Sequence, residues 1–209
     1  MTANTAAARA RMVSEQLRAR DIRDPRVLAA MGRVPRDAFV PEAVRHEGYD
    51  DHPVPIGHGQ TISQPYIVAY MTEALRVEAS HRVLEIGTGC GYQTAVLAEL
   101  AHEVYSVEVI AALADTARRT LEGLGYERVH IRVGDGHQGW PGHAPYDRIL
   151  VAAAAETVPP ALVGQLADTG VLVIPVGVWH QELRVLRKHG ERLELLATLA
   201  VRFVPLVKR

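Results

Sequence analysis

The strongest constraint on this chain is a predicted strand that runs into a glycine-rich turn and then into a helix. Residues Val83–Ala95 read VLEIGTGCGYQTA, with glycines at positions 87, 89 and 91. Glycine adopts positive φ angles and lets a ligand approach the backbone closely. The dinucleotide-binding pattern G-x-G-x-x-G does not fit, because Tyr92 stands where the third glycine is required. Glu85, two residues before the first glycine, favours a cationic ligand over a pyrophosphate.

Strands and helices are predicted to alternate around this turn. The expected strands are Arg82–Ile86, Glu103–Val107, Val129–Val133, Tyr146–Ala152 and Gly170–Val176, and the expected helices are Tyr92–Ala101, Ile110–Gly123 and Pro159–Ala167. This alternation is typical of right-handed βαβ units that build a parallel sheet with helices on both faces. Beyond it, Glu182–Lys188 and Arg192–Val207 are β-rich and joined by a predicted hairpin turn. We therefore expect an antiparallel edge on a mostly parallel sheet.

The N-terminal third is predicted to be helical and irregular. Proline opens a helix at Pro25–Met31, and Gln64-Pro65 opens another whose apolar residues recur at helical spacing. Between them, Pro35–Gly59 holds four prolines and three glycines, so we expect an extended loop region. Met1–Ser14 is rich in alanine and arginine and has no acid, which fits either a short transit peptide or a frayed terminus.

Composition argues against several classes of protein. The 209 residues carry 23 basic and 24 acidic side chains, so the basic excess of a general nucleic-acid binder is missing. One cysteine, Cys90, cannot form an internal disulfide, and we expect it to be a small filler residue. The ten histidines show no metal-ligand spacing, so we expect no metal. The longest apolar stretches fall short of the ~20 residues that span a bilayer.

Acids also follow the second and third predicted strands. Glu108 stands where a carboxylate can accept hydrogen bonds from the hydroxyls of a ribose, and Asp135-Gly136 can face an adenine ring. Strand ends beside a glycine turn form the crevice in which open α/β sheets bind ligands. A ribose, an adenine and a positively charged tail together describe S-adenosylmethionine. A purely structural glycine turn is the alternative.

These features resemble the nucleotide-binding motifs of Rossmann-like class I S-adenosylmethionine-dependent methyltransferases. Four further segments resemble the protein-L-isoaspartate O-methyltransferase family, in the same order and at matching distances: Gly59–Pro65 (GQTISQP), Gly134–Trp140 (GDGHQGW), Tyr146–Ala155 (YDRILVAAAA) and Val201–Val207 (VRFVPLV). The resemblance extends from about Met12 to the C-terminus. The chain departs from the family pattern at Cys90, His137 and 168–170, where no expected functional group is lost.

The resemblance implies an α/β, Rossmann-like methyltransferase fold with an N-terminal helical extension, in one domain over residues 1–209. Residues 1–80 would supply helices and the active-site loop, 81–177 the cofactor-binding core, and 178–209 a C-terminal β segment. The implied reaction moves a methyl group from S-adenosylmethionine, giving S-adenosylhomocysteine, to the free α-carboxylate of L-isoaspartyl residues in damaged proteins and peptides. The methyl ester would then cyclise to a succinimide. We expect a cytoplasmic monomer that binds neither nucleic acid nor a membrane.

The resemblance also implies the site residues. Ser63 would be the catalytic residue and orient the substrate carboxylate. By position alone an N-cap of the following helix is the favoured role, and the two roles are compatible. The cofactor-binding set is Ile62, Ser63, Gln64, Glu85, Gly87, Thr88, Gly89, Gly91, Glu108, Val109, Asp135 and Gly136. The substrate-binding set is Thr61, Ile62, Ser63, Phe203, Val204 and Pro205. No strong general base is expected, because a carboxylate with a reference pKa of about 4 is already ionised at pH 7.

Three other functions remain open. A methyltransferase for small molecules or nucleic acids would be expected to show a basic surface and an Asn/Asp-Pro-Pro-aromatic motif, both of which are missing. A nicotinamide dehydrogenase is opposed by Tyr92 and Glu85. A binding module that has lost turnover would keep the same pocket.

The C-terminal motif VRFVPLV has two interpretations. It either completes a core strand or, because Pro205 cannot donate a ladder hydrogen bond, forms an edge that pairs with an extended peptide. On the second interpretation, ending the chain after Arg202 abolishes peptide methylation and leaves S-adenosylhomocysteine binding within about tenfold.

Overall fold

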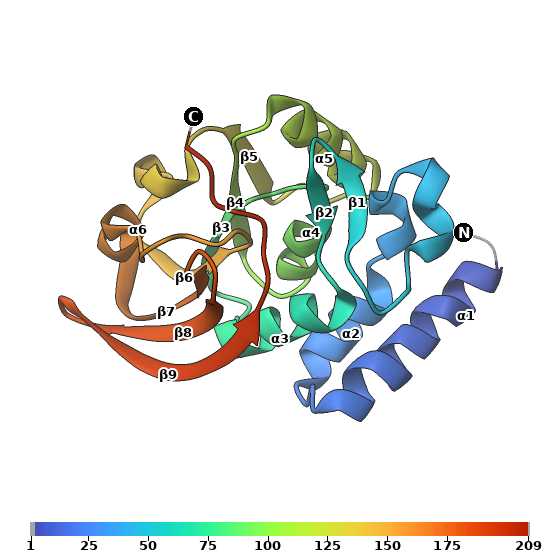
Figure 1. The fold of residues 1–209 in the computed structure, drawn as a ribbon, viewed down its shortest axis with the longest axis horizontal. Helices are drawn as coiled ribbons and strands as arrows, with labels where there is room; N and C mark the ends of the chain where they lie inside the picture. Colours follow the sequence, from blue (N-terminus) through green and yellow to red (C-terminus); the bar gives the residue numbers. More distant parts are fainter. Residues whose placement is uncertain (1–2, 209) are drawn as a thin grey trace.

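A mixed seven-stranded sheet forms the centre of the molecule in a computed structural model that describes residues 3–208 (Figure 1). The strands are β3 (Arg82–Ile86), β4 (Glu103–Glu108), β5 (Val129–Val133), β6 (Tyr146–Val151), β7 (Leu166–Val176), β8 (Gln181–His189) and β9 (Arg192–Val201). Their order is β5-β4-β3-β6-β7-β8-β9. The first five are parallel, and β8 and β9 continue the sheet in antiparallel pairing. The predicted parallel sheet with an antiparallel C-terminal edge is confirmed.

Helices cover both faces of this sheet. They are α3 (Pro65–Leu75), α4 (Tyr92–Ala98), α5 (Ala111–Gly123) and α6 (Pro160–Gln165). The N-terminal helices α1 (Ala3–Arg11) and α2 (Pro25–Arg33) pack mainly against other helical segments. Successive strand side chains point to opposite faces. In β3, Val83 packs with side chains of α3 and α4, whereas Leu84 packs with side chains of α6. Both faces of β3 are therefore buried, as a central strand of a doubly covered sheet requires.

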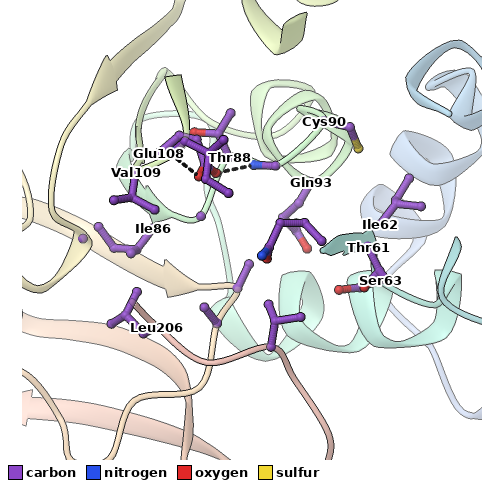
Figure 2. Close-up of a pocket in the computed structure, with 18 of the residues that line it drawn as sticks. Thr61, Ile62, Ser63, Ile86, Thr88, Cys90, Gln93, Glu108, Val109 and Leu206 are labelled. Atoms are coloured by element: carbon purple, nitrogen blue, oxygen red, sulfur yellow. Dashed lines mark hydrogen bonds between the residues drawn. The ribbon is translucent and has the colours of Figure 1, made fainter. Parts of the chain in front are cut away.

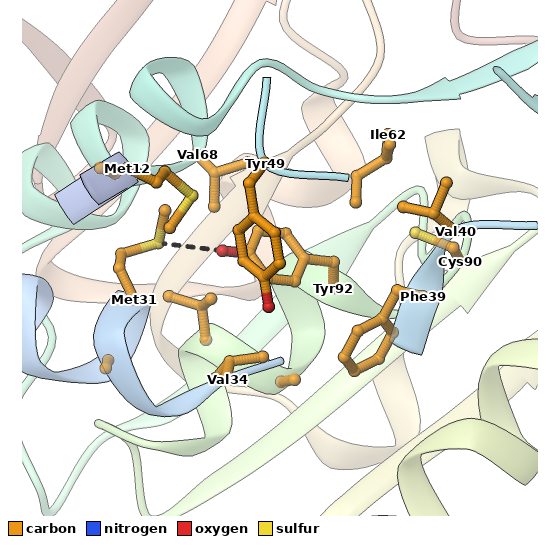
Figure 3. Packing of buried hydrophobic residues seen from close by; sticks show 14 of the residues in the cluster. Met12, Met31, Val34, Phe39, Val40, Tyr49, Ile62, Val68, Cys90 and Tyr92 are labelled. Carbon is orange, nitrogen blue, oxygen red and sulfur yellow. Dashed lines mark hydrogen bonds between the residues drawn. The ribbon is translucent and has the colours of Figure 1, made fainter. Parts of the chain in front are cut away.

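A second cluster of buried side chains joins the N-terminal helices to this core (Figure 3). Tyr92, at the start of α4, lies at its centre and donates a hydrogen bond to the sulfur of Met31 at 3.7 Å. The ring of Phe39 meets the ring of Tyr92 edge-on, with centroids 5.7 Å apart. The N-terminal extension therefore packs directly behind the glycine turn that ends β3.

The structure corrects several predicted boundaries. Pro35–Gly59 is not an extended loop: it holds the 3₁₀ turns Arg36–Phe39 and Glu42–Glu47 and the strand β1 (Val54–Gly57), which pairs with β2 (Gln60–Ile62). The prolines made the segment look like a loop, and its apolar residues, which have no periodic spacing, are buried only in the tertiary structure.

Four other segments differ at their ends or fall partly outside the description. The first predicted core helix ends at Ala98, and β7 begins at Leu166, inside the segment predicted as helix. β9 ends at Val201, so the prediction that the strand extends through Arg202–Val207 is wrong. The segment Met1–Ser14, interpreted as a transit peptide or a frayed terminus, begins with two residues outside the described range. From Ala3 on, the segment is helical. No helix of residues 3–208 combines the length and apolar character needed to cross a membrane.

Candidate active site

The glycine turn after β3 forms one wall of a pocket at the carboxyl edge of the parallel strands (Figure 2). Gly87 and Gly89 both have positive φ, 90° and 55°, which explains why neither position holds a residue with a side chain. The Gly87 N–H donates to the Val107 carbonyl at 2.8 Å, which joins the turn to β4. A Cβ on Gly89 would lie 3.4 Å from the Ile56 side chain, an ordinary contact, so within the protein itself the positive φ is the reason for glycine at this position.

Glu108, at the end of β4, is the acidic side chain of this pocket. Its Oε2 accepts a hydrogen bond from the Gly89 N–H at 2.8 Å, and its Oε1 accepts one from the Ile110 N–H at 3.0 Å. The side chain is buried, which fixes its orientation. A carboxylate offers about four lone-pair positions, so acceptor capacity remains for two hydroxyl groups.

The remaining walls are mostly apolar. Ile86, Val107, Val109, Ile110, Ala152 and Leu206 all line the pocket. Gly136 also lines it, and a Cβ there would overlap the Ile86 side chain and lie 3.2 Å from Leu206. The pocket thus offers a fixed carboxylate for a ribose, apolar walls for a flat ring and glycine backbone for a close approach. These residues fit an S-adenosyl group.

Glu85 occupies a different place from the one the sequence suggested. It is fully buried and does not line the pocket. Its Oε2 accepts hydrogen bonds from the hydroxyls of Thr94 and Ser106, both at 2.6 Å, while its Oε1 has no hydrogen-bond partner among the described residues. Burial raises the pKa of Glu85 to about 7, against the opposing effect of these two hydrogen bonds. The side chain braces β3 against α4 and β4 behind the turn.

Gly91 likewise lies outside the pocket lining. Its φ is 93°, and it is the residue that caps the start of α4. A Cβ on Gly91 would lie 3.0 Å from the Leu121 side chain and 3.2 Å from that of Ala117. Glycine at this position therefore allows α4 to pack closely against α5.

Two further predicted cofactor residues lie at the rim. Gln64 uses its amide Nε2 to donate to Asp51, at 3.0 Å to the backbone carbonyl and 2.9 Å to Oδ1. Asp135 Oδ1 accepts from the His137 N–H and lies 2.9 Å from its ring Nδ1. Burial acts to raise the pKa of Asp135, but these hydrogen bonds and the charges of His137 and Lys208 outweigh it, so the pKa lies below its ordinary value. Asp135 lines a neighbouring groove and is not among the pocket residues.

Ser63 lies between the pocket and a second hollow, which Thr61, Phe203 and Val204 also line. The cap position of α3 belongs to Gln64, and the Ser63 hydroxyl makes no hydrogen bond within the described chain. The N-cap alternative for Ser63 is therefore wrong. Its hydroxyl is available to a ligand that reaches the boundary between the two spaces (Figure 2).

The C-terminal segment closes this boundary. Its backbone pairs with Ala154 through two hydrogen bonds. The Ala154 N–H donates to the Val204 carbonyl at 2.8 Å, and the Leu206 N–H donates to the Ala154 carbonyl at 2.7 Å. On the other side, Phe203 donates its N–H to Gln181 Oε1 at 2.6 Å and accepts from Gln181 Nε2 at 3.2 Å. The backbone of Phe203, predicted as a free edge, is therefore held by a side-chain amide.

Sequence reasoning missed Gln181 and the apolar walls. Gln181 carries no sequence signal, because its partner is 22 residues away. Ile86 and Leu206 lie inside motifs that the sequence singled out, and Ile110 follows Glu108 and Val109, so nearness to these motifs was the available signal. Cys90 also lines the pocket, and burial raises the pKa of its thiol to about 11, as suits a filler residue. Within residues 3–208, no group of three potential metal-ligating side chains is found.

Comparison with known proteins identifies a family model and several relatives that match nearly the whole chain. The family model for protein-L-isoaspartate(D-aspartate) O-methyltransferase matches residues 7–209. A protein-L-isoaspartate O-methyltransferase of Opitutus terrae is 58% identical over 215 residues, covering 99% of this chain and 92% of its own length. The protein of the same name from Picosynechococcus is 57% identical over 202 residues, covering 97% and 91%.

Solved structures agree with these sequence relatives. A structure of a protein-L-isoaspartate O-methyltransferase superimposes with a TM-score of 0.86 at 29% identity; the match covers 94% of this chain and 65% of that one. A Plasmodium falciparum protein described as a protein-L-isoaspartate O-methyltransferase, in complex with S-adenosyl-L-homocysteine, gives a TM-score of 0.81 at 26% identity. That match covers 96% of this chain and 99% of the other.

Proposed function

This chain belongs to the protein-L-isoaspartate(D-aspartate) O-methyltransferase family, and from that premise we propose how its pocket performs the reaction. The enzyme transfers a methyl group from S-adenosylmethionine to the free α-carboxylate of L-isoaspartyl residues in damaged proteins and peptides. The methyl ester then cyclises to a succinimide with loss of methanol, and opening of that ring regenerates some normal aspartate.

We assign the cofactor to the pocket at the ends of β3 and β4. S-adenosylmethionine supplies an electrophilic methyl group on a sulfonium sulfur. The fixed carboxylate of Glu108 accepts the ribose hydroxyls, Ile86 and Leu206 cover the adenine, and Gly87 and Thr88 receive the tail. The observation that carries this assignment is the pair of hydrogen bonds that hold Glu108 between Gly89 and Ile110 in a mostly apolar pocket.

The other cofactor residues act from the rim or through the turn. Asp135, whose pKa is lowered, stays ionised and can accept a hydrogen bond from an exocyclic amine at the rim. Glu85 is a positioning residue, since its carboxyl group reaches the glycine turn only through β3, Thr94 and Ser106. Gly91 and Gln64 keep α4 and the entry to α3 in place.

We assign the substrate carboxylate to Ser63. Its hydroxyl donates to the carboxylate, while Thr61, Ile62 and the C-terminal residues Val204 and Pro205 shape the passage on either side. The carboxylate is already an anion at neutral pH, so catalysis needs in-line placement and water exclusion instead of a general base. The apolar walls supply that exclusion.

We further propose that residues 1–209 act as one domain and as a monomer in the cytoplasm, without nucleic-acid or membrane partners. The formal net charge of −1 gives no general attraction to nucleic acid. Light scattering of the purified protein, with and without S-adenosylhomocysteine, measures the oligomeric state directly.

The decisive experiment supplies labelled S-adenosylmethionine with an isoaspartyl peptide and with its normal-aspartyl twin. We expect base-labile methyl incorporation into the isoaspartyl peptide alone. Equal incorporation into both peptides would overturn the proposed substrate. Binding of S-adenosylhomocysteine without any methyl transfer would instead indicate a binding module.

A further inference from the structure

Three of the five large apolar side chains exposed on the surface of the described chain lie together. The five are Leu124, Val178, Trp179, Leu195 and Val207. Three of them, Val178, Trp179 and Val207, line a single groove. We call it the C-terminal groove; it lies between the turn 177–181 that joins β7 to β8, the C-terminal segment 201–208, and the loop 154–161. Single exposed apolar residues are ordinary on protein surfaces, but a cluster in a groove indicates an interaction site.

Trp179 is the most exposed member, with 93% of its surface accessible. The turn that carries it is nevertheless well anchored. The Gly177 N–H donates to the Ala155 carbonyl at 2.9 Å, and a Cβ on Gly177, whose φ is 125°, would overlap the His180 carbonyl. The indole is therefore presented to solvent from a fixed backbone, so little order has to be imposed on the turn when a ligand binds.

The groove adjoins the space assigned to the substrate. Phe203 and Arg202 line both the C-terminal groove and the hollow that Ser63 borders. Gln181, from the Trp179 turn, holds the Phe203 backbone through two hydrogen bonds. A polypeptide that places one residue at Ser63 must extend beyond it, and this groove is a surface that adjoins its path.

The groove suits an apolar side chain better than a charged one. Its charged residues are mixed in sign, with Arg202 and Lys208 against Asp135 and Glu156, so no single charge is favoured. Tryptophan offers a large flat apolar area, and it is enriched among the residues that dominate binding energy at interfaces.

We propose that Trp179, together with Val178, is a specificity subsite for an apolar or aromatic side chain that flanks the isoaspartyl residue of the substrate polypeptide. The proposal rests on the function assigned above, because it takes the isoaspartyl residue to lie at Ser63. It makes Trp179 a determinant of which damaged sites are repaired first.

A set of short peptides tests this subsite. The reference peptide has only glycine and serine around isoaspartate, and in each of the others one flanking residue is leucine. At the favoured position, leucine is expected to lower KM about five- to thirtyfold in the parent enzyme. The Trp179→Ala variant is expected to bring this KM ratio close to one, and Trp179→Phe to retain most of it.

Leu195→Ala is the matched control, because Leu195 is 54% exposed on β9 and lines none of the three pockets. It is expected to leave the KM ratio unchanged, and a thermal melt checks that both alanine variants are folded. The proposal is overturned by a ratio near one in the parent enzyme for every position of leucine. An equal ratio in the parent and Trp179→Ala enzymes overturns it as well.

Fluorescence gives a readout that needs no turnover. Because the chain has two tryptophans, Trp140→Phe leaves Trp179 as the sole indole emitter. In this variant, with S-adenosylhomocysteine present, the leucine peptide is expected to shift emission to the blue and reduce acrylamide quenching. The glycine-serine peptide, at equal saturation, is expected to change neither. Identical spectra with both peptides would refute the subsite even if no methyl transfer occurred, so its failure is distinguishable from failure of the proposed function.

Discussion

The backbone N–H of Gly89 donates a hydrogen bond of 2.8 Å to the carboxylate of Glu108. Gly89 lies in the turn after β3 and Glu108 is the last residue of β4, so the bond fixes the glycine turn relative to the end of β4. The same carboxylate also accepts from Ile110. One side chain therefore shapes the backbone of the pocket as well as presenting acceptors to a ligand.

Glu108→Ala is expected to weaken S-adenosylhomocysteine binding by about 1–3 kcal/mol, because it removes the ribose acceptor and leaves the Gly89 and Ile110 N–H groups unpaired. Titration calorimetry measures the loss. Glu122→Ala, at an exposed position of α5, serves as the control. Unchanged affinity in the Glu108 variant would remove this residue from the cofactor site.

Gly136→Ala is expected to lower both stability and cofactor affinity. The added Cβ would overlap Ile86 and crowd Leu206, and such overpacking costs typically about 1–3 kcal/mol. Gly123→Ala is the opposite control, because a Cβ there, at the end of α5, meets nothing within 4 Å. That change is expected to stabilise the protein by about 0.5–1 kcal/mol. Urea unfolding measures the stability of both variants, and an equal change in the two would contradict the prediction.

Ser63→Ala is expected to reduce kcat/KM for an isoaspartyl peptide by roughly tenfold to a hundredfold, because a misplaced carboxylate reacts slowly. Its affinity for S-adenosylhomocysteine is expected to stay the same, as is its melting temperature. Ser80→Ala, on an exposed turn, controls for loss of a hydroxyl elsewhere. A fall in cofactor affinity in proportion to the rate would assign Ser63 to the cofactor site.

Ending the chain after Arg202 is expected to abolish methylation and to weaken S-adenosylhomocysteine binding as well. The structure revises the sequence-based expectation of near-normal cofactor binding, since Leu206 lines the cofactor pocket. Truncation also removes both backbone hydrogen bonds to Ala154. A chain that ends after Val207 keeps these contacts and is the matched control. Cofactor affinity within about tenfold of the full-length value in the shorter chain would show that the wall is dispensable.

Glu85→Gln is expected to stabilise the protein at pH 8 and not at pH 4. Because the folded-state pKa of Glu85 is raised to about 7, the native state binds a proton more tightly than the unfolded chain. Its contribution to stability is complete below about pH 4.5 and is lost as pH rises through about 7. The amide keeps acceptor capacity for Thr94 and Ser106 without the buried charge, a difference on the order of 3 kcal/mol at pH 8. Denaturant midpoints at the two pH values test this; an advantage independent of pH would contradict it.

Much of the fold was predictable because its signals are local. The alternation of apolar runs and amphipathic helices identified the five parallel strands, and the hairpin after Gly177 identified the antiparallel edge. Gly87, Gly89, Glu108 and Gly136 were predictable as pocket-lining residues for the same reason, since glycines and acids at strand ends stand beside the crevice of an open sheet.

The N-terminal third was not predictable in the same way. Phe39 and Ile56 are buried against partners far along the chain, and no periodic pattern marks them. The end of β9 is a similar case: Pro205 indicated departure from regular pairing, but its bridge to Ala154 depends on a residue 51 positions away.

The sequence by itself determined the parallel sheet, the glycine turn and the type of ligand, because strand periodicity, positive-φ glycines and strand-end acids are properties of short segments. Only the tertiary structure decided which acids reach that ligand. Glu85 lies on the same face of β3 as Val83, where α4 covers it, whereas Glu108 ends its strand at the open edge. Tertiary packing likewise placed Gln181 on the Phe203 backbone and exposed Trp179 beside it. The physical reason is that burial and long-range hydrogen bonding depend on which elements pack together, and a local pattern cannot specify that.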